Sequence, residues 1–385
     1  MKKSLLALAA GTFALGIAEF VMMGIIGKLS QDLGVSISQT GHLISAYASG
    51  VCFGAFFLLF MRKYKLKNLM MLFAAVIAVG NIGAALAPDF HTLMLARFIS
   101  GLPHGAFFGV GAIVARRLVD PSRQVQAVSI MIAGMTIATL CGVPMATFLT
   151  NNFSWRIAFG VVGASGVITF VAIKLFVPQV GKLDPIGFWG QFRFLRTLPP
   201  WLIFGGVILA QTGLYCWYSY VDPLLVHVSG FTTDDLSWLM VVGGAGMLVG
   251  NLFSGRMGNY FKPAAIASAI MFAGLPTLAA IYFCSTISWL AVVLLFMGTA
   301  ILFGSGSPLQ SSIVGYSKGG EMLGAALIQI AYNAGNAIAA WLGGIFIARY
   351  DDYRLPTVAG MPLVLAGAVM ILILYRRFER EKTRG

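Results

Sequence analysis

Charged residues are scarce in this sequence of 385 residues. Asp, Glu, Lys and Arg make up 10% of the chain, whereas hydrophobic residues make up 58%. So little polar surface cannot cover a globule in water, which excludes an ordinary soluble domain. The apolar runs of about 20 residues suit membrane helices, because a helix of that length crosses the hydrocarbon core and satisfies its own backbone groups. The sequence therefore predicts an all-α membrane protein.

Cysteine is rare, and several well-known chemical motifs are missing. The four cysteines fall inside apolar runs without metal-ligand spacing, so we expect neither disulfides nor a metal site. The sequence has no H-E-x-x-H motif, no G-x-x-x-x-G-K-[ST] loop and no dinucleotide-binding G-x-G-x-x-G followed by an acid. We therefore expect no cofactor and no ATP-driven step. The net charge of +13 does not indicate a nucleic-acid partner, since the basic residues lie between apolar runs.

Hydropathy predicts twelve transmembrane helices in two sets of six. The one long polar segment between the sets gives three expected regions: an N-terminal six-helix bundle at 1–177, a cytoplasmic linker at 178–199 and a C-terminal six-helix bundle at 200–385. Glycines recur at a constant offset in the two halves, which indicates an internal repeat and two pseudo-symmetric bundles. The paired positions are Gly34 with Gly230, Gly50 with Gly246, and Gly54 with Gly250.

Basic residues mark the sidedness of the predicted spans. Lys and Arg concentrate in alternate loops and at both termini, while the opposite loops hold only Lys28, Arg156, Arg349 and Arg354. By the positive-inside rule both termini are expected in the cytoplasm. The apolar N-terminal stretch lacks a signal-peptidase site, so we interpret it as a retained first helix of a multi-pass protein of the bacterial inner (plasma) membrane.

Few ionisable residues fall inside the predicted spans. Glu19 and Arg97 each lie about 9 Å below the outer surface of a 30 Å core, on a rise of about 1.5 Å per residue. A buried charge in lipid normally faces a partner or a watery cavity, so we expect these two to act together in proton coupling, although a static ion pair is the alternative. His104 follows Arg97 by seven residues on the same expected helical face, either as a satisfied core histidine or as a proton relay or substrate ligand.

Polar side chains at spacings of three or four form two stripes in later spans. In lipid, such stripes face protein or water, so they either make interhelical hydrogen bonds or line a substrate cavity. Two methionines in the fifth span either pack or adapt to varied ligands. With His104, the expected cavity residues are Met131, Met135, Gln211, Tyr215, Tyr218, Gln329, Asn333 and Asn336.

Several segments resemble a known family. Residues 11–20 (GTFALGIAEF) resemble the first-helix signature of the drug:proton antiporters of the major facilitator superfamily, in the arabinose-efflux-permease-like branch. The likeness extends over essentially the whole chain and recurs at 41–47, 97–108, 142–144 and 153–156. It implies two rocking bundles around a central cavity, a fourth-helix arginine at Arg97 and a gating fifth-helix motif that includes Gly142 and Pro144.

This chain departs from the family pattern in two places. Ala146 stands where many members have glycine, and Arg62 stands where the loop after the second span usually has an acid. Because that acid sits against the start of the eleventh span in the family, we expect a reversed gating pair of Arg62 with Glu321. The alternative is that Arg62 is only a topology signal.

The residues and the resemblance together predict a proton-coupled transporter, not an enzyme, that exports a sugar-like or drug-like small molecule by alternating access. Its expected partners are that substrate, protons and membrane lipid, and the chain is expected to act as a monomer. One alternative is a sugar or nucleoside facilitator that ignores the proton gradient. The other is an intramembrane serine hydrolase, which would need a base and an oxyanion hole beside Ser305 or Ser307.

Overall fold

The computed structural model describes residues 2–61, 64–120, 124–181, 188–258, 260–318 and 320–380. These residues form helices joined by short connections, with no strand among them. Eleven segments of this described chain are long and apolar enough to cross a membrane. The helix α3 (Ile37–Met61) is a further helix of 25 residues, which brings the segments of spanning length among the described residues to twelve. The prediction of an all-α membrane protein is confirmed.

The first six spans consist of the following helices. Span one comprises α1 (Lys2–Phe20), the short 3₁₀ segment η1 (Val21–Gly24) and α2 (Ile26–Leu33). Spans two to six are α3, α4 (Leu66–Ala85), α5 (Phe90–Gly101) with α6 (His104–Arg117), α7 (Gln124–Ile137) with the π-helical η3 (Ala138–Gly142) and α8 (Val143–Asn152), and α9 (Trp155–Phe176).

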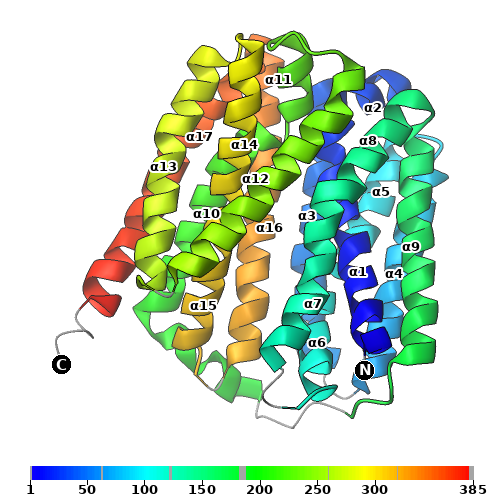
Figure 1. The fold of residues 1–385 in the computed structure, drawn as a ribbon, viewed down its shortest axis with the longest axis vertical. Coiled ribbons are helices and arrows are strands. Elements are labelled where there is room, and N and C mark those ends of the chain that lie inside the picture. The colour runs from blue at the N-terminus through cyan, green and yellow to red at the C-terminus, as the bar shows by residue number, and fades with distance from the viewer. Residues whose placement is uncertain are drawn as a thin grey trace.

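The second six follow η4 (Phe188–Arg196). They are α10 (Leu198–Tyr218) with α11 (Val221–His227), α12 (Leu236–Met257), α13 (Pro263–Cys284), α14 (Ser288–Gly304) with α15 (Gly306–Tyr316), α16 (Glu321–Tyr350), and α17 (Leu355–Leu374) ending in η6 (Tyr375–Glu379). A 3₁₀ turn, η5 (Thr233–Asp235), precedes α12. Because the spans alternate in direction, Lys2 and the end of η6 lie on the same side of the bundle (Figure 1). We call this the terminus side, and the opposite side the far side.

Equivalent helix pairs pack together in the two halves. The contact of α4 with α9 is repeated by α13 with α17, that of α1 with α7 by α10 with α16, and that of α3 with α5 by α12 with α14. Each half is a six-helix bundle, and the two lie side by side (Figure 1). They meet mainly where α3 contacts α16 and where η3 and α8 contact α12.

The repeated glycines explain the close approach of these helices. A Cβ at Gly50 or Gly54 would lie 2.1 or 1.7 Å from the carbonyl oxygens of Phe98 and Leu102. In the second half, a Cβ at Gly246 or Gly250 would lie 2.4 or 2.0 Å from the carbonyl oxygens of two residues of α14. Small residues therefore let the backbones touch at equivalent places in both bundles, as expected of membrane helices.

Gly34 and Gly230, the other predicted pair, both adopt a left-handed backbone, with φ of 64° and 76°. This conformation favours glycine because it places a Cβ against the backbone. Both residues lie just after the first span of their half, so the repeat extends to the turns.

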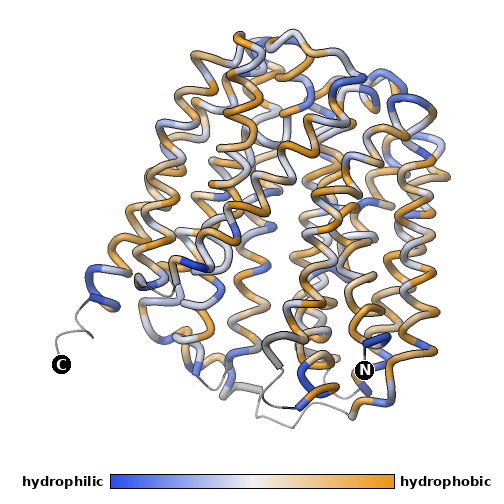
Figure 2. Tube along the Cα trace, in the orientation of Figure 1, coloured by the Kyte–Doolittle hydropathy of each residue, from blue (hydrophilic) through white to orange (hydrophobic). Residues whose placement is uncertain are grey.

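The outside of the bundle is apolar along its length. Hydrophobic residues dominate the long helices, while hydrophilic ones gather toward the two ends (Figure 2). Large side chains such as Val79, Leu175 and Phe283 are 65%, 67% and 74% exposed on these helices. Exposed apolar surface on this scale is stable only where lipid covers it.

Several spans are interrupted. The first passes from α1 through η1 into α2, which ends at Leu33, and the seventh passes from α10 into α11, which ends at His227. The fourth and tenth are broken before His104 and Gly306. A hydropathy profile does not detect such interruptions, because the residues on both sides of each one are apolar.

Candidate functional site

Four buried residues with polar side chains meet inside the first bundle. Glu19 lies in the last turn of α1, Tyr47 on α3, Arg97 on α5 and His104 at the first position of α6. Their exposed fractions are between 0% and 6%. The three neighbouring spans therefore isolate this group from lipid. We call it the polar cluster.

His104 connects two members of the polar cluster. Its Nε2 lies 3.6 Å from Oε2 of Glu19, and its Nδ1 lies 2.8 Å from the hydroxyl of Tyr47. The ring also stacks on Phe108, with centroids 5.3 Å apart. One imidazole nitrogen is thus held by the tyrosine, so the other is aimed at the carboxylate.

Arg97 lies over the ring of Tyr47. Its Cζ is 4.4 Å from the centre of that ring and 5.5 Å from the centre of the Phe159 ring. Its Nη1 donates a 2.7 Å hydrogen bond to the carbonyl of Ala18, the residue before Glu19. Among the described residues, Nε and Nη2 of Arg97 have no hydrogen-bond partner. A buried guanidinium with free donors can take up a new acceptor when one approaches.

The structure places Arg97 and His104 differently from the sequence expectation. We expected the two on one face of a continuous helix, but the span is broken at Leu102 and Pro103, and His104 begins the next helix. The break is consistent with the proline, which cannot donate to the helix ladder. Sequence reasoning did not single out Tyr47 or Phe159, although Tyr47 lies in one of the family-like segments.

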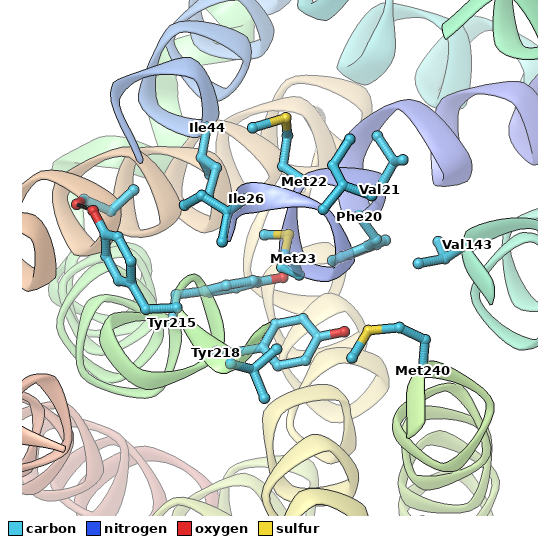
Figure 3. Close-up of a cluster of buried hydrophobic side chains, with 14 of the residues drawn as sticks. Phe20, Val21, Met22, Met23, Ile26, Ile44, Val143, Tyr215, Tyr218 and Met240 are labelled. Carbon is cyan, nitrogen blue, oxygen red and sulfur yellow. Dashed lines mark hydrogen bonds between the residues drawn. The ribbon is translucent and has the colours of Figure 1, made fainter. Parts of the chain in front are cut away.

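Glu19 also faces the second bundle. It is close enough to interact electrostatically with Tyr215 and Tyr218 of α10. The neighbouring Phe20 contacts Phe303 of α14, with ring centroids 5.5 Å apart. Figure 3 shows Phe20 and Met23 turned toward Tyr218 and Met240 of the second half. The polar cluster therefore borders the interface between the bundles.

Three of the predicted cavity residues, Gln329, Asn333 and Asn336, lie on α16. Asn333 and Asn336 are buried, whereas Gln329 is half-buried. The Nδ2 of Asn333 donates to the carbonyl of Gln329 at 3.0 Å, and the Oδ1 atoms of both asparagines lack a partner among the described residues. Gln211 lies on α10 and packs against Gly335 of α16.

The two methionines of α7 lie within the first bundle. Met131 is buried against Gly111 of α6, and its carbonyl accepts the hydroxyl of Thr12. Met135 is half-buried and packs on Gly16 of α1. Both therefore contact helices of their own bundle.

The predicted gating residues occupy two regions. Gly142 ends the π-helical η3, where a Cβ would lie 2.5 Å from Cγ1 of Ile17, and Pro144 is in the first turn of α8. Glu321 is the first residue of α16, on the terminus side. Arg62 lies outside the described residues, so its pairing with Glu321 stays a prediction.

A family model for the Major Facilitator Superfamily matches residues 8–326 of this sequence. The chain belongs to the major facilitator superfamily. As a major facilitator protein it is a multi-pass membrane transporter and not an enzyme, which confirms the predicted resemblance and fold.

Relatives and solved structures agree with this assignment. The chain is 37% identical to AraJ, a candidate transporter of Escherichia coli (strain K12), over 99% of this chain and 97% of that protein. It is 29% identical to the inner membrane transport protein YdhP of the same strain, over 98% and 97% of the two chains. The fold matches a bacterial homologue of the human lysosomal transporter Spinster, solved inward-facing and unoccupied, with a TM-score of 0.76 at 15% identity over 98% of this chain and 97% of that one.

Proposed function

We propose that this major facilitator protein is a proton-coupled exporter that moves a small sugar-like or drug-like molecule out of a bacterial cell. It works by alternating access, with the bundles at 1–177 and 200–385 rocking about their interface. It lies as a monomer in the inner membrane with both termini in the cytoplasm. A relative of similar length is named as an inner membrane transport protein, which supports the location.

The observation that carries the proposal is the position of Glu19. Glu19 is 6% exposed and borders the second bundle. Its Oε2 lies 3.6 Å from Nε2 of His104, and the preceding residue, Ala18, accepts a hydrogen bond from Arg97. A carboxyl group at that position can take up a proton from one side of the membrane and release it to the other only if its surroundings change between the two states. An interface between two moving bundles supplies such a change.

Arg97 supports a switching role for the polar cluster. Its unpartnered Nε–H and Nη2–H groups can donate to the charged Glu19 in one state, while in the present arrangement the carboxylate lies against His104. Protonation of Glu19 would remove the charge that attracts the guanidinium. The proton could therefore select between two arrangements of α1 and α5 by differential binding.

Substrate contact is assigned to side chains along the interface. Tyr215 and Tyr218 offer hydroxyl groups and ring faces, and the unpartnered oxygens of Asn333 and Asn336 offer hydrogen-bond acceptors. The proposed cavity set also includes His104, Gln211, Gln329, Met131 and Met135, of which the two methionines pack within the first bundle in this structure. Such a set suits a molecule with several hydroxyl groups and an apolar face.

The test replaces Glu19→Gln in proteoliposomes. Gln keeps the shape and resembles the protonated carboxyl group, so substrate counterflow should survive while accumulation driven by a proton gradient fails. Asp235→Asn is a matched control, because this carboxylate lies on the far side and accepts hydrogen bonds within its own bundle. Wild-type proton flux in Glu19→Gln would refute the coupling role. Wild-type transport that ignores the proton gradient would instead show a facilitator.

A further inference from the structure

One carboxylate outside the polar cluster joins the two bundles. Asp222 lies at the start of α11, just after α10 ends, and is 3% exposed. Its Oδ2 accepts a 2.8 Å hydrogen bond from the backbone N–H of Gly27, at the start of α2 in the first bundle. The bond therefore crosses the interface on the far side, where α2 and α11 adjoin (Figure 1).

The amide that Asp222 binds belongs to a helix start without a cap of its own. The first N–H groups of a helix have no partner within the helix and are usually satisfied by a side chain just before it. The residue before α2 is Ile25, which makes no side-chain cap. A carboxylate is the favoured group at such a position, because the helix dipole is positive there. Asp222 thus caps a helix of the opposite bundle.

Glycine at position 27 leaves room for this contact. A Cβ there would lie 3.2 and 3.3 Å from the two carboxylate oxygens of Asp222. These distances are tighter than ordinary contacts, and any larger side chain would reach the carboxylate itself. The absence of a side chain on Gly27 therefore lets the two bundles approach.

The connection between α10 and α11, which we call the joint, makes a second contact with the first bundle. Tyr220 is fully buried, and its hydroxyl donates to the carbonyl of Ala340 at 2.5 Å. A Cβ at Gly41 of α3 would lie 2.0 Å from that hydroxyl oxygen. The joint therefore places a ring against α3 and a carboxylate against α2.

We propose that Asp222 is the latch that holds the far side of the transporter closed. This inference rests on the proposed alternating access, since the two atoms of the bond belong to the bundles that must separate when the far side opens. The Asp222–Gly27 bond is made only in the far-side-closed state, so it stabilises that state over the far-side-open one. Asp222 acts on the gate and does not need to touch the substrate.

The experiment measures hydrogen–deuterium exchange of the full chain in lipid nanodiscs, without substrate or a proton gradient. The variants are Asp222→Ala, which removes the acceptor, and Gly27→Val, which pushes against the carboxylate. Asp235→Ala is the control, because Asp235 lies on the far side but accepts hydrogen bonds from Thr232 and Trp238 of its own bundle. Loss of a hydrogen bond to a charged group should shift the balance toward the far-side-open state by about tenfold or more.

The expected result is opposite changes on the two sides. In both variants, peptides covering residues 26–37 and 219–232 should exchange faster, and peptides on the terminus side should exchange more slowly as that side closes. Asp235→Ala should leave both sides unchanged except at the amide of Thr232, whose own hydrogen bond to that carboxylate it removes. Asp222→Asn, which keeps an acceptor oxygen, should fall between wild type and Asp222→Ala, and it serves if the alanine variant does not fold.

Two outcomes would overturn the latch. Faster exchange confined to α2 would show that Asp222 only caps that helix, and unchanged exchange in both variants would show that the bond does not hold the gate. Failure of proton coupling in the Glu19 experiment is a separate result, because exchange is measured without protons being driven across the membrane. A facilitator would need the same latch.

Discussion

Removing the hydroxyl of Tyr47 should separate the two contacts that this residue makes in the polar cluster. Tyr47→Phe deletes the 2.8 Å hydrogen bond to Nδ1 of His104 but keeps the ring 4.4 Å from Cζ of Arg97. Tyr47→Leu deletes both. A comparison of the two variants therefore measures the hydrogen bond and the cation–π contact in turn.

The magnitudes follow from burial. Leaving a buried imidazole nitrogen without its partner costs about 1–3 kcal/mol, so Tyr47→Phe should lower the free energy of unfolding by that amount. A desolvated cation–π contact contributes about 2 kcal/mol, and Tyr47→Leu should lose this as well. Without the tyrosine hydroxyl, the imidazole is also free to turn away from Glu19. Proton flux should then fall more than substrate counterflow.

The assay is equilibrium unfolding in mixed detergent micelles, combined with proton flux and counterflow in proteoliposomes. Tyr350→Phe is the matched control, because this ring is 56% exposed and the same substitution should change neither stability nor coupling. If Tyr47→Phe is as stable as wild type and keeps its full proton flux, the hydroxyl does not hold His104. The reasoning would then be refuted.

Two further predictions concern packing and pH. Gly54→Ala should lower the free energy of unfolding by about 1–3 kcal/mol through overpacking, because the new Cβ would meet the carbonyl of Leu102. Gly160→Ala is the control, because nothing lies within 4 Å of its new Cβ. In the same unfolding assay it should leave stability unchanged or raise it by up to about 1 kcal/mol. In the loop after α16, the hydrogen bonds from Arg354 hold the pKa of Asp352 below its ordinary value. The pair therefore stabilises the fold fully at pH values above that ordinary pKa. This stabilisation is lost as the pH falls through the lowered pKa. Asp352→Asn should remove this pH dependence at a cost of less than about 1 kcal/mol, seen by comparing unfolding near neutral pH and near pH 3.

Much of the fold could be predicted from the sequence because membrane spans obey a simple rule. An apolar run of about 20 residues has few alternatives to a helix in lipid, and the alternation of spans then fixes which loops share a side. The breaks could not be predicted in the same way. Residues 21–25 continue the apolar pattern, so nothing in hydropathy marks the end of α1.

The candidate site was predicted in part. The estimated depths of Glu19 and Arg97 placed them at the same level, and both lie in the polar cluster. The role of Tyr47 between Arg97 and His104 depends on α3 packing against α5 and α6, which no local spacing shows. The bond from Asp222 to Gly27 joins residues 195 positions apart in the chain, so only the arrangement of the two bundles reveals it.

The short segment η1 lies between Glu19 and Gly27 in a single span. A bend at this segment would tilt α2 relative to α1, whose last turn holds Glu19. A helix of eight residues is about 12 Å long at a rise of 1.5 Å per residue, so a tilt of about 10° at this segment displaces its tip by about 2 Å. Such a displacement is several times the range of about 0.5 Å over which an N–H···O hydrogen bond holds, so it would break a polar contact at the tip of α2. A small torsion in Val21–Gly24 could thus transmit force from the carboxyl group of Glu19 to the far side without moving the rest of the helix.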